Sequence, residues 1–200
     1  MNRSNDTARG AAALADPLAA LRAATGARHE RLDSGLPLSA PAPSLPDYAG
    51  HLLMVRDWLL PLQAWLDGYA DGPQAEASLP PTHRLSLIDA DLREPGMPVP
   101  PAVRPAAEWP RGASAAYRWG VAYVIEGSQL GGAVLHARLA ERFGPHPLRY
   151  LRGEQGGPGP RWRAFMLALR ANVRSAEEIA EACAGACAAF DSILELVPQK

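Results

Sequence analysis

Residues 114–144 carry the stretch that decides the fold class of this chain, SAAYRWGVAYVIEGSQLGGAVLHARLAERFG. The stretch predicts one long helix, interrupted by glycine at Gly127, Gly131 and Gly132. Each glycine in a helix interior costs about 1 kcal/mol relative to alanine, so three in this stretch need a compensation. Close helix–helix packing would supply it, and so would a flat ligand that lies close to the backbone. The spacing does not fit a phosphate-binding loop.

Helical spacing also dominates the rest of the chain. A first helix is expected to start near Asp16 and to end before Pro37. Further helices are expected from Pro46 to Leu66, over 82–93 with Thr82 as its cap, over 161–174, and from Ser175 to Leu196. Connectors rich in proline or glycine separate them at 37–46, 94–111 and 144–160. No segment shows the period-2 alternation of a strand, so the chain is predicted to be all-α, with six to eight helices.

Length and composition indicate a single domain. The chain has 200 residues, of which 48% are hydrophobic, and a net charge of −1. We expect a flexible arm over 1–14 and one domain over 15–200. The absence of a basic surplus argues against nucleic-acid binding, and no apolar run is long enough for a membrane span or a signal peptide. Two cysteines, Cys183 and Cys187, complete neither a zinc site nor a disulfide framework, which favours a cytoplasmic setting.

One histidine of the five stands out by its surroundings on the first helix. His29 follows the stripe of Leu18 and Leu21 and is expected to point inward. Asp33, four residues on, can orient the imidazole, as carboxylates do behind metal-ligating histidines. Arg22 lies two turns earlier, about 10 Å along the axis. An iron ligand with a cation at that offset would suit a flat tetrapyrrole with anionic propionates. The alternative is that Arg22 and Asp33 are ordinary boundary residues beside a core stripe.

Two stretches together resemble the haem oxygenase family. Residues 21–33, LRAATGARHERLD, are similar to its proximal helix, and residues 123–132, YVIEGSQLGG, are similar to its distal helix. A weak resemblance extends from about residue 16 to residue 197. It is strongest to the bacterial branch of the family that is found alongside bacteriophytochromes. The resemblance implies a single-domain helical bundle in which haem is sandwiched between the proximal helix and a glycine-kinked distal helix.

The resemblance also implies roles for particular residues. His29 would be the axial iron ligand, with Asp33 as its supporting partner. Gly127, Gly131 and Gly132 would let the distal helix lie close over the haem. The haem-binding residues would further include Arg22 and Arg163, which would meet the propionates, and Tyr123.

The distal motif departs from the family's common pattern at Ser128. Many haem oxygenases have an aspartate there, which organises water around bound oxygen. Because a serine hydroxyl carries no charge near neutral pH, we expect Ser128 to support that water network only indirectly. A second cationic position, one turn after Arg163, is Leu167 in this chain. The seating of the propionates, and hence the carbon at which the ring is cut, is therefore open.

The implied reaction is oxidative cleavage of haem to biliverdin, carbon monoxide and iron. Haem would be both substrate and oxygen activator, and a ferredoxin or another reductase would supply electrons. The product would provide the bilin chromophore of a bacteriophytochrome. Two alternatives remain at this point: a haem-binding carrier or sensor of the same fold without turnover, and an all-α interaction module without a cofactor.

Overall fold

The computed structural model describes residues 16–98 and 108–197. The predicted arm over 1–14 lies outside these residues. The described part contains helices and no strand, which confirms the all-α prediction. Its elements are α1 (Pro17–Gly35), η1 (Pro37–Ser39), α2 (Leu45–Leu66), η2 (Gly72–Ala75), α3 (Arg84–Leu92), α4 (Ala115–Phe143), α5 (Arg149–Arg152), α6 (Gly159–Asn172) and α7 (Ala176–Leu194), where η denotes a 3-10 helix.

Local sequence signals explain how several helices begin. Asp16 caps α1, and Pro17 is its first residue, as predicted. At the start of α7, Ser175 and Glu178 form the expected capping box. A second capping box, which the sequence analysis missed, starts α2 at Leu45. The expected cap at Thr82 is wrong, because α3 begins at Arg84 and its N-cap side chain makes no capping hydrogen bond.

The structure also corrects the predicted loop over 144–160, which contains the single turn of α5. Asp91 of α3 holds this turn in place. Its buried carboxylate accepts hydrogen bonds from the backbone nitrogens of Arg149 and Tyr150 at 3.0 and 2.9 Å and from the Tyr48 hydroxyl at 2.6 Å. A turn of four residues has no periodicity of its own, so this tertiary contact, which the sequence does not reveal, determines it.

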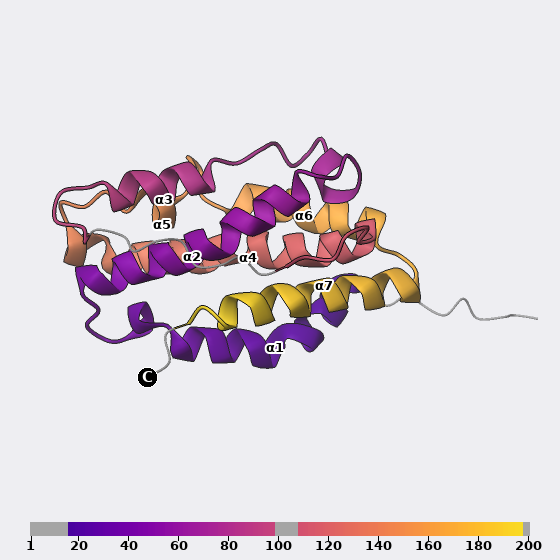
Figure 1. Cartoon of the computed structure of the whole chain (residues 1–200), viewed down its shortest axis with the longest axis horizontal. Helices are drawn as coiled ribbons and strands as arrows, with labels where there is room; N and C mark the ends of the chain where they lie inside the picture. The colour runs from indigo at the N-terminus through magenta and orange to yellow at the C-terminus, as the bar shows by residue number, and fades with distance from the viewer. Residues whose placement is uncertain (1–15, 99–107, 198–200) are drawn as a thin grey trace, which may run out of the picture.

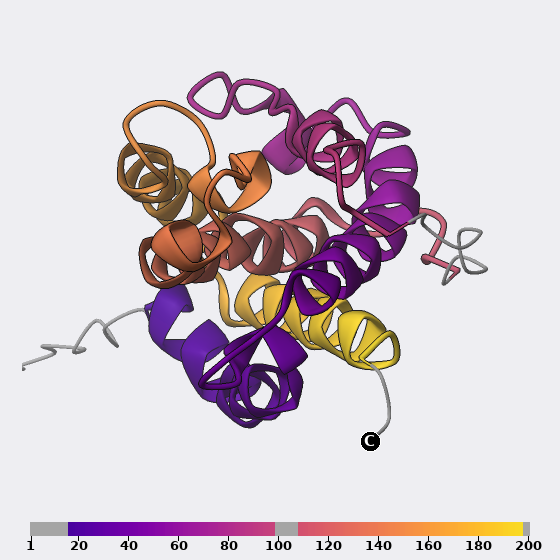
Figure 2. The ribbon, with the colours of Figure 1, turned by 90° about the vertical axis from the view of Figure 1, so that its left-hand side faces the viewer.

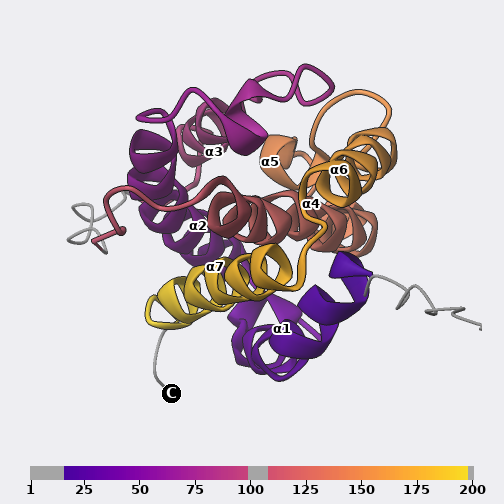
Figure 3. The same cartoon turned by 90° about the vertical axis from the view of Figure 1, so that its right-hand side faces the viewer.

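Helix α4 runs through the centre of the molecule, with other helices packed around it (Figures 1 and 3). It continues through Gly127, Gly131 and Gly132, so the interruption expected at these glycines is wrong. Helix α7 lies beside both α4 and α1 (Figure 2). The buried segment of α4 before Gly127 packs against other helices, and such packing supplies most of the stability of helices in proteins. No helix of the described ranges is long and apolar enough to cross a membrane.

Candidate functional site

Helices α1 and α4 run in the same direction, and α7 packs against both of them (Figure 1). In the first half of each helix, Tyr123 of α4 interacts with Arg22 and Thr25 of α1. Beyond the end of α1, Arg138 of α4 donates hydrogen bonds to the backbone carbonyls of Leu38 and Ser39. The number of residues from the first contact to the second is similar along α4 and along the segment that contains α1. The second half of α1, where His29 lies, is therefore level with the glycine segment of α4.

His29 pairs with the carboxylate predicted to orient it. Its Nδ1 lies 3.1 Å from an oxygen of Asp33, which leaves Nε2 as the ring atom that can bind a metal. The imidazole lies edge-on to Phe190 of α7, with ring centroids 5.9 Å apart. The inward orientation expected for His29 is wrong, because 63% of its side chain is exposed. On a helix, His29 lies about 80° from Leu21, at the margin of the stripe that packs against the core.

The glycine segment of α4 presents an open face. Tyr123, Gly127, Gly131 and Val134 fall within about 80° of one another around the helix. A Cβ on Gly131 would meet no atom within 4 Å, and 70% of Val134 is exposed. Helix packing therefore does not explain Gly131, which is exposed on this face of α4. A Cβ on Gly132 would lie 3.7 Å from the Leu151 carbonyl oxygen, an ordinary contact with α5.

Two predicted haem-binding residues meet at one end of this face. The half-buried Tyr123 has a raised pKa because burial disfavours the phenolate, although the charge of Arg22 and hydrogen bonds with Thr25 and Arg22 act in the opposite direction. The ring of Tyr123 also lies 5.6 Å from that of Trp162 in α6. Arg163 follows Trp162 along α6 and is exposed. The structure thus joins Arg22 to Tyr123 and places Arg163 on the adjoining helix.

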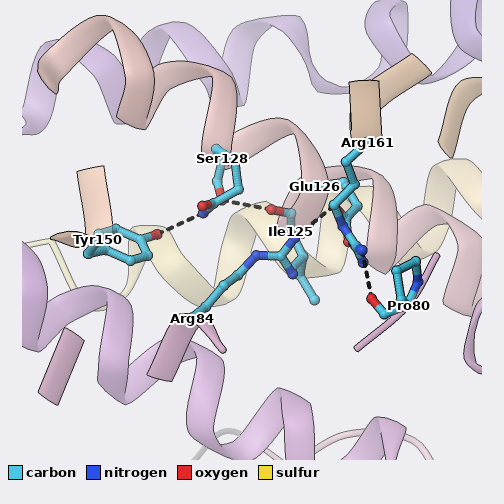
Figure 4. Close-up of polar contacts among 8 residues, drawn as sticks. Pro80, Arg84, Ile125, Glu126, Ser128, Tyr150 and Arg161 are labelled. Atoms are coloured by element: carbon cyan, nitrogen blue, oxygen red, sulfur yellow. Dashed lines mark hydrogen bonds and ion pairs between the residues drawn. The ribbon is translucent and has the colours of Figure 1, made fainter. Parts of the chain in front are cut away.

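Ser128 belongs to a hydrogen-bonded chain that connects α4 with Tyr150 of α5 (Figure 4). Its hydroxyl donates to the carbonyl of Ile125 at 2.8 Å and accepts from the side-chain amide of Gln129 at 3.4 Å. The same amide nitrogen is 3.2 Å from the hydroxyl of Tyr150 in α5. Ser128 is therefore held by protein groups at the side of α4.

A buried ion cluster, which the sequence analysis missed, stands just before Gly127 (Figure 4). Glu126 accepts from Arg161 of α6 at 2.7 and 2.9 Å and from Arg84 of α3 at 2.7 Å. Burial opposes ionisation of Glu126, but the two guanidinium groups outweigh it and lower its pKa. The side chain of Glu126 is 9% exposed. The one available signal was a glutamate inside an apolar helical run.

Two cavities, of about 280 and 50 Å³, lie on the other side of α4 from Gly131. Both are lined by Thr82 and Arg84, the larger one together with Ile125 and the smaller one with Glu126 and Gln129. They belong to the face of α4 that carries the ion cluster. The predicted site residues line neither of them.

The comparison with known proteins gave one match to a curated protein at this level of similarity. No family model matches the chain. A curated protein of Xanthomonas campestris pv. campestris (strain 8004), named Heme oxygenase, is 43% identical to it over 110 residues. The matched part covers 54% of this chain and 62% of that protein. Over about half of its length, the chain is therefore similar to a haem oxygenase.

Proposed function

We propose that this protein cleaves haem oxidatively to biliverdin, carbon monoxide and iron. One observation carries the proposal: His29, paired with Asp33, lies level with the open glycine face of α4. A planar ligand bound by His29 would extend over a helix that presents hydrogen atoms in place of side chains. The similarity to a protein named Heme oxygenase supports the same substrate.

We place haem in a groove between α1 and α4, where the residues present fit it as a substrate. The Nδ1 of His29 lies 3.1 Å from Asp33, so Nε2 is the ring atom that would bind iron. The open space at Gly131 leaves room on the opposite side of the plane. When bound, haem supplies the iron that activates oxygen. The protein's part is to position the macrocycle and to restrict access of water.

We place the propionates at the end of the groove where Arg22 meets Tyr123. Guanidinium groups bind carboxylates through charge-assisted hydrogen bonds, and Arg22 has its side chain on that end. The exposed Arg163 would take the second propionate from α6. Leu167, one turn further, is 64% exposed and provides no charge.

Ser128 would affect proton transfer only indirectly, through the groups to which it is hydrogen-bonded. Its hydroxyl is already engaged by Ile125 and Gln129 and carries no charge. Gly127 and Gly131 would contribute space and backbone groups beside ordered water, whereas Gly132 faces α5. Ser128 thus replaces a charged residue of the common family pattern with a neutral one that is fixed in orientation.

The remaining assignments follow from the resemblance. We propose that a ferredoxin or another reductase donates the electrons, that the protein acts in the cytoplasm, and that its product serves a bacteriophytochrome of the same cell. The alternative of a haem carrier or sensor shares the binding site and differs in turnover. The exposed His29 and the open face at Gly131 favour haem binding over an interaction module without a cofactor.

The proposal is tested in two steps with the purified full chain. Haemin is added first, and the visible absorption spectrum reports binding through a histidine. Oxygen and a reductant are then added, and biliverdin and carbon monoxide are measured. Binding with turnover supports the enzyme; binding without turnover supports the carrier. The absence of a haemin spectrum would leave the interaction module.

Substitution of His29 identifies the ligand. We expect His29→Ala to remove the axial-histidine signature and turnover, while His136→Ala, on α4, keeps both. Loss of the signature in His136→Ala, with its retention in His29→Ala, would contradict the assignment.

A further inference from the structure

Two consecutive residues of α6 hold two consecutive residues of α4. Arg161 binds Glu126 through two hydrogen bonds of 2.7 and 2.9 Å. Trp162 reaches the neighbouring face, where its ring atoms Cη2 and Cζ3 lie 3.7 and 3.8 Å from the position of a Cβ on Gly127. The tip of the indole therefore stands beside the open glycine face.

The indole of Trp162 is supported from several sides. It stacks on Phe165 with an interplanar angle of 17° and a centroid distance of 5.5 Å. It also lies against the ring of Tyr123 at 5.6 Å. The bidentate pair of Arg161 with the buried Glu126 holds the backbone next to it. A side chain with these supports presents the same edge to any ligand, because ring contacts and packing restrict its rotamers.

Trp162 stands at one end of the proposed groove, where α4 meets α1 through Tyr123. Tyr123, which it contacts, reaches across to Arg22 and Thr25 of α1. This is the end at which we place the propionates, and Arg163 directly follows Trp162 in α6. A planar ligand held by His29 thus meets a rigid aromatic wall at one edge.

We propose that Trp162 determines the orientation of haem within its plane, and with it the bridge carbon that is removed. This inference rests on the proposed function. A bond between His29 and iron allows rotation about its own axis, so the axial ligand alone does not select among the four bridges. A rigid wall at one edge excludes the rotations that push a peripheral substituent into it. Leu167, at the position where the resemblance implies a second cation, offers no charge to a propionate. Steric exclusion by Trp162 therefore contributes to the selection of the bridge carbon.

The test compares two substitutions of Trp162 with a matched control. Trp162→Leu removes the wall but keeps an apolar side chain against Phe165, and Trp162→Phe retains an aromatic ring. Trp65→Leu makes the same change at a partly buried tryptophan of α2, which packs on Trp109 at 5.2 Å, away from the groove. Each full-length protein is loaded with haemin. Biliverdin isomers are separated by chromatography, and circular dichroism in the haem absorption band reports orientation without turnover.

We expect Trp162→Leu to change the ratio of biliverdin isomers by about tenfold, the usual weight of one apolar contact in discrimination. The dichroism of its haemin complex should change as well, and Trp162→Phe should restore both toward wild type. Wild-type ratios and dichroism in Trp162→Leu, or an equal change in Trp65→Leu, would overturn the inference. If the wild type binds haemin but forms no biliverdin, the proposed function fails, and the dichroism alone decides whether Trp162 orients the ligand.

Discussion

Gly120 of α4 lies directly against the backbone of Ala182 in α7: a Cβ on Gly120 would stand 1.8 Å from the Ala182 carbonyl oxygen. Gly185 of α7 meets Tyr117 of α4 in the same way, at 2.0 Å from its carbonyl oxygen. These two glycines let the helices cross with their backbones in contact. Because α7 also packs along α1, the crossing contributes to the spacing of α1 and α4 on either side of the groove.

We expect Gly120→Ala to destabilise the protein by about 3 kcal/mol or more, because the added methyl group meets backbone that no rotamer change moves away. Denaturant unfolding measures the effect. Gly50→Ala in α2 is the control: a Cβ there meets nothing within 4 Å, and alanine should stabilise that helix by about 0.5–1 kcal/mol. Equal stability of Gly120→Ala and the wild type would contradict the close crossing.

Gly131→Leu should leave the haem-free protein nearly as stable as the wild type, since its side chain enters open space. The same variant should bind haemin poorly, because the leucine occupies the volume above the ligand plane. Thermal unfolding of the haem-free protein and a haemin titration measure the two effects. Gly50→Leu adds the same side chain at another open helical position and should bind haemin normally. A large loss of stability in haem-free Gly131→Leu would instead indicate helix packing.

Glu126→Gln should lower the free energy of unfolding by about 3–5 kcal/mol, because it leaves the charges of Arg84 and Arg161 without their buried partner. Arg170→Gln is the control, since its pair with Asp16 is roughly half exposed and surface ion pairs contribute little to stability. Both are measured by denaturant unfolding near pH 7. Similar small losses in the two variants would show that the cluster contributes no more than a surface pair.

His51 should make the protein less stable in acid. Its Nδ1 is buried without a hydrogen-bond partner in the described residues, and burial lowers its pKa from 6.5 to about 4. The unfolded chain then binds a proton that the folded protein rejects, so stability is full above pH 6.5 and falls as the pH drops toward 4. We expect this group to account for up to about 3 kcal/mol between pH 7 and pH 4.

His51→Gln provides the comparison, because glutamine does not titrate. The pH dependence of its unfolding free energy between pH 6.5 and pH 4 should be flatter than that of the wild type. Parallel curves for the two proteins would mean that His51 is protonated equally in the folded and unfolded states.

Much of the fold could be predicted from patterns among residues that are close together in the sequence. Capping residues and apolar spacing predicted α1, α4 and α7, because these signals act within a few residues of the helix they define. The pairing of His29 with Asp33 could also be predicted from the sequence, since residues four apart share a helix face. By contrast, α5 was missed, because its hydrogen bonds to Asp91 come from a distant helix.

The sequence by itself determined an all-α chain and the two helices that carry the candidate site. Only the tertiary structure decided that His29 faces outward, that Gly120 is a packing glycine while Gly131 is open, and that Trp162 stands beside Gly127. Periodicity states which residues share a face of one helix, but it does not state what that face meets. That depends on contacts between segments far apart in the chain, which pack in one arrangement because side-chain volumes and buried charges must be matched together.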